Sequence, residues 1–166
     1  FTKQKNHIFL LNFFSKNLYY LDKYELLIIG EGEMKKSYEK IVISKKLEKK
    51  VKILDYKKNV INFINNAKCI ISSSLWEDPG FIMVEAASVG TPIISSNCPS
   101  GPKEFIDNNK NGFLYQSNDE ESFKNELDSF LNTSNEELFK KLKNAKKKCR
   151  LYSSYYNYKK LSYLLN

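Results

Sequence analysis

The chain has 166 residues, a length typical of one domain that is large enough to fold around its own hydrophobic core. Apolar residues make up 42% and charged residues 28%, values that exclude wholesale disorder and fibrous repeats. The net charge is +8, but Arg150 is the only arginine. Because arginine supplies the planar fork that recognises base edges, we expect no nucleic acid among the partners.

Short apolar segments alternate with amphipathic ones through the first two thirds of the chain. Strands that are buried on both faces are continuously apolar, so we predict strands over Tyr24–Ile29, Val51–Leu54, Cys69–Ser72, Pro92–Ser95 and Phe113–Tyr115. Helical spacing predicts helices over Ile8–Leu18, Met34–Leu47, Val60–Ala67 and Phe81–Val89, and then, without further strands, over 119–131, 136–152 and 155–165. This order predicts an α/β class, a Rossmann-like doubly wound parallel sheet with helices on both faces and a helical C-terminus.

The first six residues have the character of a loop that precedes a helix. A doubly wound domain is expected to begin with a strand. We therefore expect residues 1–166 to form a single domain whose first strand lies outside this sequence.

The lysines gather in two segments, 45–50 and 140–148. Two interpretations remain open: these are solvated helix faces, or they attract anionic lipid or a phosphorylated substrate, with peripheral association at a membrane surface. The three cysteines are far apart in sequence, and residues 1–20 carry no signal-peptide pattern, so a cytoplasmic location is expected. No apolar run approaches the roughly 20 residues that span a bilayer.

The chemistry is concentrated between Ser72 and Gly112. Glu77 follows a predicted strand, and Glu85 lies in the next helix among apolar neighbours, where a carboxylate is costly unless it is paired. The start of that helix offers backbone N–H groups and a positive dipole end, which suit a diphosphate. Two carboxylates for hydroxyl groups beside such a helix start fit a nucleotide-sugar site. The alternative stays open here: Glu85 in a salt bridge with a lysine, and Glu77 as a helix-start charge.

Common catalytic signatures are absent from the sequence. It has no P-loop, no G-x-S-x-G elbow, no H-E-x-x-H pair and no D-x-D. Gly30-Glu31-Gly32 follows a strand, but the third glycine of the dinucleotide fingerprint is missing, so a tight turn into the next helix is the simpler interpretation.

The segment 77–92, EDPGFIMVEAASVGTP, resembles the motif of two glutamates separated by seven residues in family 4 retaining glycosyltransferases. Further blocks resemble that family in the same order, at 2–7, 26–32, 51–56, 101–106 and 111–114. The resemblance covers essentially the whole chain. It implies the C-terminal, donor-binding domain of the GT-B fold, with an N-terminal acceptor domain outside this sequence.

The resemblance also implies roles for particular residues. Glu77 and Lys5 would be catalytic, with Glu77 contacting hydroxyls of the transferred sugar and Lys5 neutralising the diphosphate. The donor-binding residues would be Glu85, which holds the ribose hydroxyls, together with Gly80, Phe81, Gly30 and Tyr56.

The implied enzyme is a glycosyltransferase of hexosyltransferase type. It would transfer a sugar with retention from a nucleotide-diphosphate sugar to a glycan or lipid-linked acceptor in surface polysaccharide biosynthesis. No metal or other cofactor is expected, since D-x-D is absent. The acceptor would bind through the missing N-terminal domain, so the isolated chain is expected to be inactive. Two alternatives remain: a non-catalytic nucleotide-sugar binding or interaction module, and another GT-B enzyme such as a sugar-nucleotide epimerase.

Overall fold

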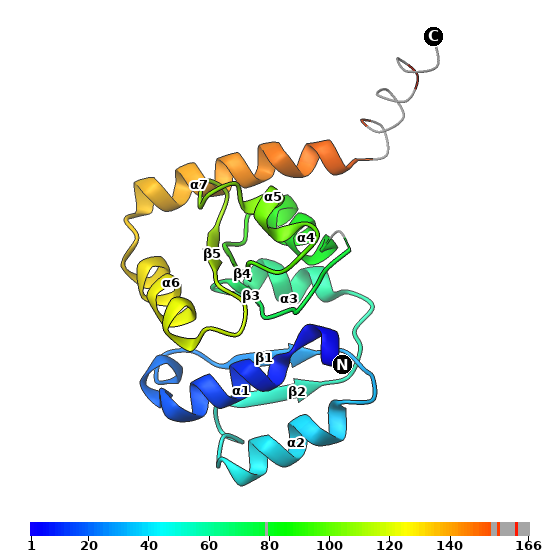
Figure 1. Cartoon of the computed structure of the whole chain (residues 1–166), viewed down its shortest axis with the longest axis vertical. Helices are drawn as coiled ribbons and strands as arrows, with labels where there is room; N and C mark the ends of the chain where they lie inside the picture. Colours follow the sequence, from blue (N-terminus) through cyan, green and yellow to red (C-terminus); the bar gives the residue numbers. More distant parts are fainter. Residues whose placement is uncertain (79, 154–155, 157–161, 163–166) are drawn as a thin grey trace.

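The computed structural model describes residues 1–78, 80–153, 156 and 162. Strands and helices alternate as far as β5, and helices follow (Figure 1). The strands are β1 (Leu26–Ile29), β2 (Val51–Leu54), β3 (Ile70–Ser72), β4 (Ile93–Ser96) and β5 (Phe113–Tyr115). The α-helices are α1 (His7–Lys16), α2 (Lys35–Ser44), α3 (Val60–Asn66), α4 (Phe81–Val89), α5 (Pro102–Ile106), α6 (Glu120–Asn132) and α7 (Asn135–Cys149). Three short 3₁₀ helices are η1 (Lys3–Lys5), η2 (Leu18–Leu21) and η3 (Arg150–Tyr152).

The strands are all paired in parallel, as the prediction of an α/β class requires. They form two sheets, however, rather than one: β1 pairs with β2, and β3, β4 and β5 form a second sheet in that order. The division has a simple cause, because no described strand lies between β1 and β3.

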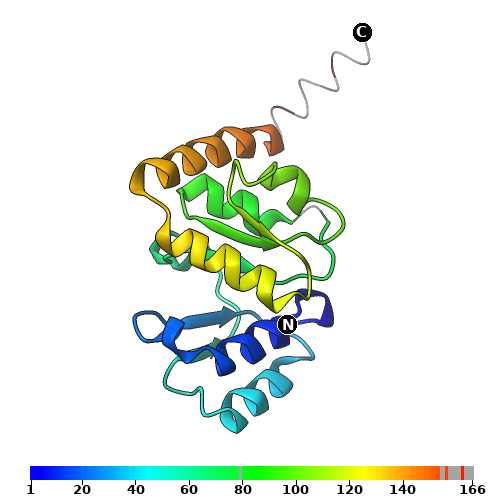
Figure 2. The same cartoon turned by 60° about the vertical axis from the view of Figure 1, so that its left-hand side comes forward.

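Helices cover both faces of the strands, and each face has its own hydrophobic core. The first core combines α1, α2 and α6 with residues of both sheets, and the second combines α3, α4, α5 and α7. Successive strand residues point to opposite faces, so Ile93 of β4 belongs to the second core and Ile94 to the first. In α1, Phe13 lies 4.7 Å from the ring of Phe123 in α6, so this helix joins the two sheets (Figure 2).

Most predicted segments agree with the observed ones to within a few residues. The bounds of α4 are as predicted, because it lies between Gly80 and Gly90, whose φ angles of 80° and 81° favour glycine at both caps. The short helix α5 was not predicted. The helix predicted over 155–165 lies outside the described residues, except for Tyr156 and Ser162. Within the described part of the chain, no helix has both the length and the apolar character to cross a membrane.

Candidate functional site

The predicted site residues gather where the parallel strands end. Gly30 follows β1, Tyr56 lies just beyond β2, and the segment 73–77 follows β3. In open α/β sheets, ligands bind outside the carboxyl ends of the strands. The edge that carries these residues is therefore the one on which this fold class places its ligands.

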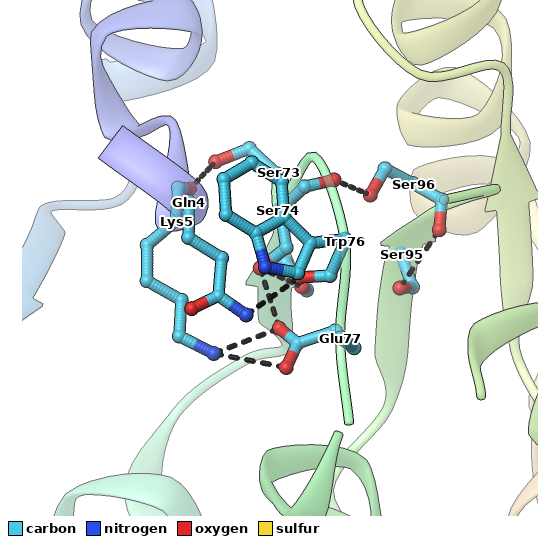
Figure 3. A network of polar contacts seen from close by, with 9 residues as sticks. Gln4, Lys5, Ser73, Ser74, Trp76, Glu77, Ser95 and Ser96 are labelled. Atoms are coloured by element: carbon cyan, nitrogen blue, oxygen red, sulfur yellow. Dashed lines mark hydrogen bonds and ion pairs between the residues drawn. The ribbon is translucent and has the colours of Figure 1, made fainter. Parts of the chain in front are cut away.

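An ion pair lies at the centre of this edge. Lys5 Nζ is 2.9 Å from each carboxylate oxygen of Glu77 (Figure 3). The Glu77 side chain is only 4% exposed, and Lys5 is 40% exposed. Ser74 Oγ also donates to the Glu77 carboxylate. The buried charge is thus compensated by one cation and one hydroxyl, which is the condition under which a carboxylate is tolerated there.

A cluster of serines fixes the η1 segment to the carboxyl ends of β3 and β4. Ser73 Oγ donates to the Lys5 carbonyl at 2.8 Å, and Leu75 N donates to the Gln4 carbonyl at 2.8 Å. Ser96 Oγ at the end of β4 donates to the Ser74 carbonyl at 2.6 Å (Figure 3). These serines were not predicted as part of the site, although a run of three at the end of a strand, Ser72 to Ser74, is the signal, since short hydroxyls bind nearby backbone groups.

Gly80 connects this network to the start of α4. Its φ is 80°, and a Cβ there would lie 2.6 Å from Met83 Cε and 3.5 Å from Glu77 Cβ and Cγ. The first helical residue, Phe81, is 59% exposed. The first N–H groups of an α-helix have no intrahelical partner. Met83 N donates to the Gly80 carbonyl at 3.0 Å, so among the described residues the N–H groups of Phe81 and Ile82 are the ones that the first turn of α4 can offer to a ligand beside the Lys5–Glu77 pair.

Glu85 lies one turn further along α4, on the same face as Phe81. Its side chain is half-buried, and this burial raises the pKa of the Glu85 carboxyl. Among the residues the structure describes, no lysine forms an ion pair with it. The salt bridge that the sequence suggested for Glu85 is thus not present among these residues. The buried ion pair is the one between Lys5 and Glu77.

Gly30 and Tyr56 belong to the other sheet and take no part in the Lys5–Glu77 network. Gly30 N donates to the Leu54 carbonyl at 3.0 Å, and a Cβ on Gly30 would lie 3.2 Å from the Phe1 ring. Tyr56 is 62% exposed. The structure therefore brings Lys5, Glu77 and Gly80 together and leaves these two at separate points of the same edge.

Two neighbouring side chains were not predicted as part of the site. Trp76 is 50% exposed, and its carbonyl accepts from Gln4 Nε2 at 2.8 Å (Figure 3). Cys98 is buried near Glu77, and burial raises the pKa of its thiol, which favours the protonated form at neutral pH. In the described ranges, no group of three His, Cys, Asp or Glu side chains is placed to hold a metal ion.

The α/β fold with parallel strands matches solved glycosyltransferase structures of the GT-B type. The model of the family described as glycosyl transferases group 1 matches residues 1–149. The chain belongs to this family.

Characterised and uncharacterised relatives agree with this assignment. A glycosyltransferase of Methanocaldococcus jannaschii without known function is 32% identical over 105 residues, which are 63% of this chain and 26% of that protein. A poly(ribitol-phosphate) α-N-acetylglucosaminyltransferase of Staphylococcus aureus is 33% identical over 89 residues, 54% of this chain and 18% of that protein. The chain thus spans about a quarter or less of the length of these relatives.

Solved structures share the fold. S. aureus TarM, as a variant in complex with fondaparinux, α-GlcNAc-glycerol and UDP, superposes with a TM-score of 0.85 at 23% identity, covering 98% of this chain and 33% of TarM. Anabaena HepE in complex with UDP-glucose gives a TM-score of 0.76 at 18% identity, covering 90% of this chain and 41% of HepE.

Proposed function

We propose that this chain is the donor-binding part of a retaining glycosyltransferase of hexosyltransferase type. It takes the sugar from a nucleotide-diphosphate sugar, and the acceptor is a glycan or a lipid-linked saccharide in surface polysaccharide biosynthesis. Named relatives support this direction, since one is an amylovoran biosynthesis glycosyltransferase of Erwinia amylovora and another a galactosyltransferase acting on a diphosphoundecaprenol-linked sugar in Escherichia coli.

The observation that carries the proposal is the Lys5–Glu77 pair beside the first turn of α4. An ammonium group has three N–H donors, and two acceptors on Glu77 leave capacity for a third. Because Lys5 is 40% exposed, a diphosphate can reach it from solvent. The free N–H groups of α4 supply the remaining anion contacts. In this arrangement the departing diphosphate is stabilised by the protein itself, and we expect no metal requirement.

Glu85 suits the hydroxyl groups of the nucleoside. Its carboxylate is partly desolvated and has no ion-pair partner among the described residues, so a pair of hydroxyl donors would compensate it. Glu77 lies nearer the helix start, and we assign it to the transferred sugar. A non-catalytic binding module would need only the nucleotide contacts, which we assign to Glu85. A transferase would also need the sugar contact, which we assign to Glu77, so variants of the two glutamates distinguish the two candidate functions.

The exposed face of α7 fits peripheral association with an anionic membrane, where lipid-linked acceptors are found. It carries an exposed aromatic ring, Phe139, at 67% exposure. The exposed basic residues on this helix and just beyond it are Lys140, Lys143, Lys146, Lys147 and Arg150. Cosedimentation with vesicles containing anionic lipid, but not with zwitterionic vesicles, would support this part of the proposal.

The test is calorimetric titration with UDP and with UDP-sugars, because UDP occupies related structures. Glu85→Gln should weaken UDP binding roughly ten- to a hundredfold, since a hydrogen bond to a charged group contributes about 1.5–3 kcal/mol. Glu77→Gln should leave UDP binding nearly unchanged and weaken the intact UDP-sugar. Binding should persist in excess chelator.

Three results would contradict the proposal. Equal losses for both variants with UDP alone would overturn the assignment of roles. Restoration of binding by magnesium after chelation would overturn the metal-independent mechanism. Indistinguishable affinities of the Glu77→Gln variant and the unmodified chain for UDP-sugar would favour the binding module. Melting curves of both variants serve as the control for folding.

A further inference from the structure

Trp76 is the only tryptophan of the chain, and it lies at the edge that carries the candidate site. It is 50% exposed, although it directly precedes Glu77, which is 4% exposed. Burying an indole removes a large apolar area from water, so a ring left half in solvent forgoes much of this stabilisation. One exposed aromatic ring is ordinary on a protein surface. The backbone and the neighbours of Trp76 distinguish it from such a ring.

The backbone on both sides of the indole is fixed by hydrogen bonds. Leu75 N donates to the Gln4 carbonyl at 2.8 Å, and Gln4 Nε2 donates to the Trp76 carbonyl at 2.8 Å (Figure 3). Glu77 N donates to the Pro99 carbonyl at 3.1 Å. Since tryptophan has only two side-chain torsions, an indole on a fixed backbone loses little conformational entropy when a ligand contacts it.

Buried and exposed side chains alternate at this point of the chain. Glu77 is buried against Lys5, whereas Trp76 and Asp78, on either side of it in sequence, are both exposed. The chain therefore presents an indole and a carboxylate to solvent directly next to the Lys5–Glu77 pair.

An aromatic face with a neighbouring carboxylate suits a saccharide. A pyranose ring has a face of C–H groups and a rim of hydroxyls. The face of an aromatic ring is negative, so it attracts the weakly positive C–H groups, while a carboxylate accepts from hydroxyls. A phosphate would be repelled by Asp78. The chemistry of these two side chains therefore favours a neutral, hydroxyl-rich ring.

We propose that Trp76 is a stacking platform for a neutral saccharide ring, and that Asp78 accepts from one of its hydroxyls. The inference rests on the proposed function, since the ring is either the transferred sugar or the nearest ring of the acceptor. Glu77 meets the transferred sugar from within the domain, and Trp76 meets a ring from the solvent side. Trp76 is thus a specificity-determining residue, through which this domain takes part in selecting the saccharide.

The fluorescence of this chain reports on Trp76 alone, because there is no second tryptophan. In the donor arm of the test, acrylamide quenching is measured with UDP and with UDP-glucose, UDP-galactose and UDP-N-acetylglucosamine. In the acceptor arm, the probes are the methyl glycosides of the same three sugars, with and without UDP. Affinities of Trp76→Leu and Trp76→Phe are measured by calorimetry for the nucleotides and by saturation-transfer NMR for the glycosides.

At least one sugar-bearing probe should lower the quenching constant at least about twofold, whereas UDP alone should leave it unchanged. A response to the nucleotide sugars alone assigns the platform to the transferred sugar, and a response to the glycosides assigns it to the acceptor. Trp76→Leu should weaken the binding of that probe at least about fivefold, and Trp76→Phe, which keeps an aromatic face, less than about threefold. The affinity for UDP should not change in either variant.

Tyr19→Leu is the matched control, because Tyr19 is 55% exposed and lies on η2, near the amino ends of β1 and β2. This variant should leave all affinities unchanged, and melting curves of each variant report on folding.

Four results would overturn the inference. The first is that no sugar-bearing probe protects the indole from acrylamide. The second is that UDP alone protects it equally, which would assign Trp76 to the nucleobase. The third is that Trp76→Leu and the unmodified chain bind every probe with equal affinity. The fourth is protection that grows with protein concentration in the absence of any ligand, which would assign the indole to a contact between copies. Failure of UDP to bind at all would instead contradict the proposed function, and the glycosides without UDP would still decide this inference.

Discussion

Lys5→Met should destabilise the domain more than Glu77→Gln does, although the two side chains form one ion pair. Lys5→Met leaves a carboxylate that is 4% exposed without its cation, whereas Glu77→Gln leaves a lysine that is 40% exposed and can be hydrated. Removing one partner of a buried pair costs about 3–5 kcal/mol. Water reaches the lysine end of this pair, so we expect about 2–3 kcal/mol for Lys5→Met.

For Glu77→Gln we expect about 1 kcal/mol, because the glutamine carbonyl can still accept from Ser74. In a domain of this size, each kcal/mol shifts Tm by roughly 2–4 °C. Lys5→Met should therefore lower Tm by roughly 4–12 °C and Glu77→Gln by roughly 2–4 °C, as measured by circular dichroism at neutral pH. The double variant should be more stable than Lys5→Met alone, since it removes the unpaired carboxylate.

Lys16→Met is the matched control. Its ion pair with Glu120 has a similar N–O distance of 2.8 Å, but the two side chains are 60% and 43% exposed. An exposed pair of this kind contributes about 0.2–1 kcal/mol. Equal Tm losses for Lys5→Met and Glu77→Gln, or a loss for Lys16→Met as large as that for Lys5→Met, would refute the explanation from burial.

Three further predictions concern the free domain. Burial raises the pKa of the Glu85 carboxyl, so the stability of the folded domain falls as pH rises through the titration of this group. Glu85→Gln should therefore raise Tm at about pH 7 and leave it unchanged near about pH 3. A lower Tm of the variant at neutral pH would contradict this explanation. Burial lowers the pKa of His7 from 6.5 to about 4, so the domain loses about 3 kcal/mol of stability as pH falls through this range. His7→Phe should abolish that loss, as measured by denaturant titrations at several pH values. An unchanged pH profile of stability in the variant would count against this prediction. Gly80→Ala should lower the free energy of unfolding by about 1–2 kcal/mol, because φ at this position is 80° and the new Cβ would contact Met83. The measurement is thermal unfolding, and an unchanged stability would show that the loop relaxes around the added methyl group.

Local patterns in the sequence were sufficient to predict most of the fold. Continuous apolar runs indicated all five strands, and the glycines on either side of α4 fixed its bounds. The helix α5 could not be predicted, because five residues beginning with Pro102 carry no helical periodicity. The division into two sheets was also beyond reach, since strand pairing depends on which strands are neighbours in space rather than on the sequence of either strand.

The candidate site was predicted in part. The resemblance to glycosyltransferases placed Lys5 and Glu77 in one site, but nothing in the spacing indicated that they touch, since 72 residues separate them. The sequence suggested a lysine partner for Glu85, but in the structure it is Glu77 that pairs with a lysine, Lys5. The turn after β3 directs Glu77 inward, whereas Glu85 lies on the face of α4 that also carries the exposed Phe81. The hydroxyls of Ser73 and Ser74, which fix the turn, were missed because serine is common in surface loops.

The separation of Lys5 from Glu77 also has a consequence for the order of folding. Closing a loop of 72 residues costs an entropy that scales as (3/2)RT ln n, or about 4 kcal/mol here. An ion pair and a few serine hydrogen bonds cannot offset this before the β3–β4–β5 sheet has formed, since they depend on its carboxyl edge for their geometry. In refolding experiments, fluorescence of Trp76, whose carbonyl binds Gln4, should therefore reach its native value after the helical circular dichroism has recovered. We therefore expect the edge that carries the candidate site to be the last part of the domain to acquire its structure.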